Sequence, residues 1–124
     1  MIQRHSVISN QRGVSAVEFA LILPVFVVFL FGMINCGLLL WTQLGMEHGV
    51  VAAARCAAIN PSTCPDVPAY ATQQAYGLDL PKTAFTLTTP ACGDQVAASY
   101  GYQFVTLLLP PMNLTLTARS CYPT

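Results

Sequence analysis

The hydrophobic positions of this chain are concentrated in one uninterrupted stretch near its beginning. Residues 19–41 read FALILPVFVVFLFGMINCGLLLW and contain no charged side chain. A helix of about 20 apolar residues crosses the hydrocarbon core of a bilayer, whereas a core helix of a soluble protein carries polar residues along one face. The pattern therefore predicts a transmembrane helix over residues 14–41.

The helical pattern continues beyond Trp41. Met46, Val50, Ala53 and Ala54 recur at helical spacing, and Asn60-Pro61 supplies a stop signal. We therefore expect the helix to continue over residues 42–59 and to project above the membrane. Residues 60–83 are rich in Pro, Ala, Thr and Gln, which indicates a loop with one helical turn.

The last third of the chain alternates as β-strands do. Strands are predicted over Ala84–Thr89, Gln95–Leu109 and Asn113–Cys121, and the last two form a hairpin that turns near Pro110-Pro111. Together these elements predict an α+β fold with a pilin-like layout, in which a short antiparallel β-meander packs on the second half of the helix.

The apolar segment LLLPPM, residues 107–112, lies at the hairpin end. It has two possible places, which the sequence leaves open. It can face a partner subunit or the membrane surface, or it can tuck under the loop over residues 60–83.

Charge gives the orientation of the helix. The chain has 124 residues, of which 8% are charged, and its formal net charge is +0, which excludes a nucleic-acid partner. Arg4 and Arg12 precede the span, and no acid occurs before Glu18. The positive-inside rule therefore predicts a cytoplasmic basic leader, residues 1–13, and a periplasmic domain, residues 42–124. A cleaved signal peptide is disfavoured, because the apolar run is too long and no A-x-A site follows promptly.

Cysteines support an oxidising location. Four of the five lie after the span, at Cys56, Cys64, Cys92 and Cys121, and an even number in a small exported domain favours two disulfides. We favour Cys56–Cys64 and Cys92–Cys121 among three connectivities. A zinc site is the alternative, but the sequence contains no CxxC pair.

Glu18 stands directly before the charge-free run, where a carboxylate is costly unless it is paired or functional. The alternative is that it marks the water interface. Gly13 followed by VSAVEF resembles the processing signature of prepilins of the tight-adherence (Flp) class, and residues 12–32 resemble the N-terminus of TadE-like minor pseudopilins.

The resemblance implies a precursor that a prepilin peptidase cuts between Gly13 and Val14, with Glu18 and Phe19 as the rest of the processing signature. Cleavage would create a charged α-amino group at Val14, one helical turn from Glu18 on the same face. In pilins, this glutamate is thought to neutralise the new amine of its own or a neighbouring subunit.

The sequence thus favours a minor pseudopilin, a structural or assembly-initiating subunit of a tight-adherence type IV pilus in the bacterial inner membrane. Its expected partners are the prepilin peptidase, other pilins and pseudopilins, the inner-membrane assembly platform and the lipid bilayer. The alternative is an unprocessed single-pass membrane-anchored assembly factor of a secretion or pilus machine. We expect no enzymatic activity, no cofactor and no metal, because no catalytic or ligating motif is present.

Overall fold

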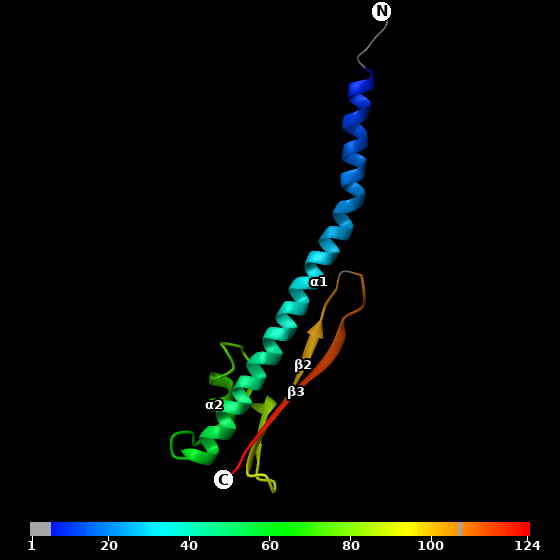
Figure 1. Cartoon of the computed structure of the whole chain (residues 1–124). Helices are drawn as coiled ribbons and strands as arrows, with labels where there is room; N and C mark the ends of the chain where they lie inside the picture. The colour runs from blue at the N-terminus through cyan, green and yellow to red at the C-terminus, as the bar shows by residue number, and fades with distance from the viewer. Residues whose placement is uncertain (1–5, 107) are drawn as a thin grey trace, which may run out of the picture.

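The fold is a long helix that carries a small sheet on its second half (Figure 1). A computed structural model describes residues 6–106 and 108–124, with side chains from residue 11 onward. The elements in chain order are α1 (Ser6–Ile59), α2 (Val67–Gln73), the 3₁₀ turn η1 (Lys82–Ala84), β1 (Phe85–Thr88), β2 (Asp94–Phe104) and β3 (Met112–Tyr122). This confirms the predicted α+β class with a pilin-like layout.

Helix α1 has 54 residues, which at about 1.5 Å per residue gives a length of roughly 80 Å. It begins at Ser6, earlier than the Val14 start expected from the sequence, since no proline interrupts residues 6–13. It ends at Ile59, because Pro61 disfavours helical geometry at Asn60. Pro24 lies inside α1 and removes one backbone hydrogen bond, and α1 bends within its blue part (Figure 1).

The first half of α1 packs against little else, whereas its second half carries the core. Met46, Val50, Ala53 and Ala54 are fully buried, as their helical spacing predicts. They pack with α2, η1 and the sheet in one cluster that also contains Phe85 and several alanines. Small side chains bring the layers close together, and the resulting core is thin.

Helix α2 replaces the single helical turn expected within residues 60–83. Asp66 caps it by accepting a hydrogen bond from the backbone N–H of Ala69, and Pro68 occupies its first turn. Both residue types favour helix starts at these positions. Asp66 remains exposed and also forms a surface salt bridge with Lys82.

The three strands form an antiparallel sheet in the order β1-β2-β3. Residues 105–111 connect β2 and β3, with Phe104 opposite Met112, and the bend at Leu108 and Leu109 lies next to Pro110-Pro111, near which the turn was predicted. Strand β2 ends at Phe104 rather than Leu109, because the prolines cannot donate ladder hydrogen bonds to an extended β2. Leu107 lies outside the described residues.

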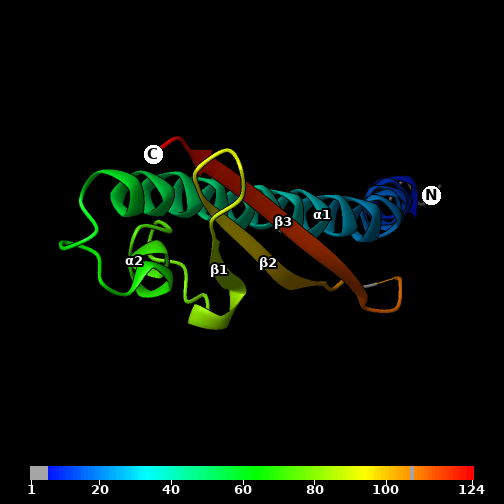
Figure 2. The same ribbon diagram turned by 90° about the horizontal axis from the view of Figure 1, so that it is seen from below.

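The view from below shows the β2–β3 hairpin crossing α1 at an angle, with α2 beside β1 (Figure 2). The hairpin end points toward the N-terminal half of α1, away from α2. The described part of the segment LLLPPM therefore does not tuck under residues 60–83, and this alternative is wrong.

Candidate functional site

The proposed processing segment lies on the exposed first half of α1. Gly13, Val14, Glu18 and Phe19 all have helical backbone, and all four are exposed to solvent. The peptide bond between Gly13 and Val14 therefore lies inside a continuous helix rather than at its beginning. A protease that binds an extended substrate would have to unwind α1 at this point.

Gly13 differs from the glycines that the fold requires. A Cβ atom added at Gly13 would meet nothing within 4 Å. At Gly49 the same atom would lie 2.8 Å from the carbonyl oxygen of Ala71, and at Gly45 it would collide with Leu78. Packing within the chain thus explains Gly45 and Gly49, and it gives no reason for a glycine at position 13.

Glu18 lies one helical turn after Val14, on the same face of α1. It forms no salt bridge with any side chain described between residues 11 and 124. Its carboxylate therefore stands, exposed, at the beginning of the apolar stretch. Such a carboxylate can form an ion pair with a positively charged group. That group can belong to another molecule or can be created by a chemical modification of this chain.

The apolar stretch itself contributes nothing to the protein core. Between Gln11 and Ile59, α1 is long and apolar enough to cross a membrane, and none of its most apolar window is buried in the fold. A core helix of a soluble protein would be largely covered. Exposure of this kind fits a single-pass membrane anchor or a pilin-type anchor.

The family model of TadE-like proteins matches residues 13–55, from the glycine of the processing segment to Arg55 near the end of α1. Over this segment, about a third of its length, the chain is similar to TadE-like proteins. Neither the curated proteins nor the solved structures contain a significant match.

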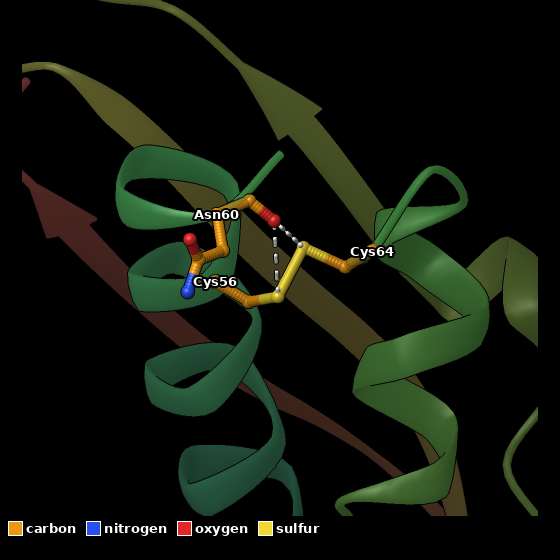
Figure 3. Close-up of a disulfide and its surroundings, with 3 residues drawn as sticks. All are labelled: Cys56, Asn60 and Cys64. Atoms are coloured by element: carbon orange, nitrogen blue, oxygen red, sulfur yellow. Dashed lines mark hydrogen bonds between the residues drawn. A yellow bond between two sulfur atoms is a disulfide. The ribbon is translucent and has the colours of Figure 1, made fainter. Parts of the chain in front are cut away.

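Two disulfides link the elements of the domain, and they are the two pairings favoured from the sequence. Cys56 joins Cys64, and Cys92 joins Cys121. The first ties the end of α1 to the segment that leads into α2, and the carbonyl oxygen of Asn60 points at both sulfurs (Figure 3). These sulfurs carry no hydrogen, so this contact is not a hydrogen bond.

The second disulfide ties the β1–β2 loop to the end of β3. Gly93, in the same loop, has φ +123°, and a Cβ atom there would overlap the carbonyl oxygen of Tyr122. A glycine is therefore required where the loop passes the end of β3. Cys36 remains a free, exposed thiol within the apolar stretch.

An aromatic cluster at the end of the apolar stretch was not predicted. The ring of Tyr76 stacks on His48 at 4.4 Å and lies 5.9 Å from the ring of Trp41. The Nδ1 atom of His48 is 2.7 Å from the carbonyl oxygen of Gln74. Trp41 and His48 flank Gly45 on one helical face. This spacing is the feature of the sequence from which the cluster could have been predicted.

No cluster of three or more metal-ligating His, Cys, Asp or Glu side chains is found among the residues whose side chains the structure describes. The four cysteines considered for zinc are paired in disulfides.

Proposed function

We propose that this chain is a TadE-like minor pseudopilin, a structural or assembly-initiating subunit of the tight-adherence (Flp) type IV pilus. The observation that carries the proposal is the long, exposed, charge-free stretch of α1 over residues 19–41, which comes directly after Glu18 and is separated from Gly13 by five residues. The family match that begins at residue 13 supports it.

The precursor spans the inner membrane with its N-terminus in the cytoplasm. Arg12 and Arg4 precede the span, and Arg4 lies outside the described residues. Positive charge on this side holds the N-terminus in the cytoplasm, and two disulfides suit a periplasmic domain.

A prepilin peptidase then cuts between Gly13 and Val14. No side chain that the structure describes covers Gly13, so an active site that unwinds α1 here meets no side chain at this position. Cleavage removes Arg12 and produces a charged amine at Val14, which pairs with Glu18 of the same chain or of a neighbouring subunit. The mature subunit would join other pilins and pseudopilins at the inner-membrane assembly platform.

N-terminal sequencing tests the proposal. The full chain is produced in cells with and without the cognate prepilin peptidase, and Val14 is the expected first residue only when the peptidase is present. Gly13→Val should block cleavage, whereas the matched control Gly37→Ala, at another open position of α1, should be cut normally. An intact N-terminus in cells with normal pili would instead favour the unprocessed assembly factor.

A further inference from the structure

The end of the β2–β3 hairpin lies beside the membrane-spanning part of α1. We define the apolar tip as residues 105, 106 and 108–111. Between the tip and α1 is a cleft of about 370 Å³, lined by Val28, Phe31, Gly32, Asn35, Thr106, Leu108 and Leu109. Figure 1 shows this orange turn alongside the cyan part of α1, well before the helix reaches α2.

The depth of the cleft follows from the geometry of α1. Trp41 closes the apolar stretch at its outer end, where an interfacial aromatic anchors a span. Asn35 and Val28 precede Trp41 by about 9 Å and 20 Å along the axis, at about 1.5 Å per residue. The hydrocarbon core is about 30 Å thick, so the cleft extends from its outer half to slightly beyond its midplane, with Asn35 nearer the outer surface and Val28 deepest.

The surface of the tip is apolar and uncovered. Leu108 is 77% exposed, Leu109 58% and Val105 56%. The hairpin carries no charged residue from Gln95 to Ala118. Exposed apolar side chains grouped in this way mark an interaction surface, and here that surface continues the apolar surface of α1.

The polar backbone groups of Leu109 in the turn find a partner within the chain. Irregular backbone is costly in hydrocarbon because its N–H and C=O groups lack partners. The hydroxyl of Thr106 accepts a hydrogen bond from the backbone N–H of Leu109 at 3.1 Å and donates to the Leu109 carbonyl at 3.4 Å. Pro110 and Pro111 have no N–H to satisfy, and the Asn35 amide donates to the Phe31 carbonyl at 2.8 Å.

We propose that the apolar tip inserts into the outer leaflet of the bilayer, with lipid acyl chains filling the cleft between the tip and α1. The periplasmic domain is then fixed to the membrane at two places, the span and the tip. This inference rests on the proposed membrane span, which places Trp41 at the outer interface.

Quenching of tryptophan fluorescence by brominated lipids tests the insertion. Trp41 is the single tryptophan of the chain, so Trp41→Phe provides a background for Leu108→Trp at the tip. The matched control is Thr88→Trp in the same background, because Thr88 is exposed at the opposite end of the sheet. The full chains are reconstituted into phosphatidylcholine–phosphatidylglycerol vesicles whose acyl chains carry bromine at a shallow or a deep position.

We expect Leu108→Trp to be quenched at least twofold more than Thr88→Trp, and by deeper bromines than wild-type Trp41. Depth is measured from either bilayer surface, so mixed insertion directions do not affect the result. Unchanged circular dichroism and intact disulfides would show that each variant is folded.

Two results would overturn the insertion, and they can be told apart. If Trp41 is quenched while Leu108→Trp behaves like Thr88→Trp, the span stands and the tip is outside the lipid. A blue-shifted, unquenched Leu108→Trp emission that depends on protein concentration would show that the tip meets a second copy instead. If Trp41 itself is unquenched, the proposed membrane span is wrong, and the proposed insertion of the tip is wrong as well.

Discussion

Glycines of α1 differ in what surrounds them, and this difference shows which of them the packing of the chain requires. Gly45 and Gly49 let the segment from Ala71 to Leu78 approach the helix backbone closely. Gly13 and Gly37 have open surroundings, and a glycine within an open helix costs about 1 kcal/mol relative to alanine. Packing explains neither Gly13 nor Gly37, so the assignment of a processing role to Gly13 rests on its place before Glu18-Phe19.

Gly49→Ala should destabilise the folded domain formed by the second half of α1, α2 and the sheet. The new Cβ atom would lie 2.8 Å from the Ala71 carbonyl oxygen, and overpacking of this kind costs about 1–3 kcal/mol. Denaturation of the full chain in detergent, followed by the fluorescence of Trp41 against Tyr76, measures the loss. Gly37→Ala is the control and should show none; equal midpoints for both variants would contradict the close approach.

Asp66 should make the start of α2 sensitive to acid. Its hydrogen bond from Lys82, then that from the Ala69 N–H, and the positive charge of Lys82 hold the pKa of the Asp66 carboxyl below its ordinary value of 3.8, against a small opposing effect of desolvation. The folded state therefore binds the proton more weakly than the unfolded state. The stabilisation is present above about pH 4 and is lost as the pH falls through the lowered folded-state pKa.

The chemical shift of the Ala69 backbone amide, followed by NMR from about pH 6 to pH 2, measures this pKa directly. Asp66→Asn keeps an oxygen that can cap α2 but removes the charge, so its amide shift should not titrate in this range. A wild-type midpoint at or above the ordinary aspartate pKa would show that Lys82 does not act on Asp66.

At the scale of elements, hydrophobic spacing predicted the long helix and the meander, but it missed α2. Val67 and Ala71 are the buried side chains of this seven-residue helix, too few for a periodic signal. The sequence signal for α2 was a capping residue, Asp66, followed by Pro68 in the first turn of the helix. The length of β2 was overestimated for a related reason, because alternation continues past Phe104 although the prolines end the pairing.

Some features of the candidate site could likewise be predicted from neighbouring residues in the sequence, whereas others could not. The order of basic tail, glycine, Glu-Phe and charge-free run is visible in the sequence because it depends on neighbouring residues. The aromatic cluster of Trp41, His48 and Tyr76 depends on where α2 places the segment after it, and the apolar tip depends on the hairpin's angle to α1. Neither position could be predicted without the tertiary packing.

The two disulfides should contribute unequally to stability. Cys92 and Cys121 are separated by 29 residues, and Cys56 and Cys64 by 8. A longer closed loop removes more entropy from the unfolded chain, so the chain-entropy estimate is about 3–4 kcal/mol for the first pair and about 2–3 kcal/mol for the second. The small core makes both contributions significant.

Urea denaturation of the Cys92→Ser/Cys121→Ser and Cys56→Ser/Cys64→Ser chains in detergent compares the two. The first double variant should have the lower midpoint, and each variant serves as the control for the other. A larger loss from Cys56→Ser/Cys64→Ser would mean that anchoring the end of α1 to α2 matters more than closing the sheet.

At the scale of the whole molecule, α1 has two halves with different partners. The second half is covered by the protein's own sheet and α2, whereas the first is exposed and must be covered by lipid or by other subunits. In the proposed assembly, the exchange of lipid for neighbouring helices brings Glu18 into surroundings of low polarity. A carboxylate there is tolerated only with a partner, and the amine created at Val14 supplies one.

Glu18→Gln should therefore leave membrane insertion and cleavage after Gly13 intact but prevent assembly. The variant leaves the amine of Val14 without a counter-charge, and breaking one side of a buried ion pair costs about 3–5 kcal/mol, which corresponds to a loss of more than about a hundredfold in subunit association. Membrane fractionation, N-terminal sequencing and quantification of sheared surface pili measure the three steps separately. Glu47→Gln is the control, since Glu47 lies beyond the span and accepts a hydrogen bond from Gln43. Wild-type amounts of pili from the Glu18→Gln strain would show that the carboxylate merely marks the water interface.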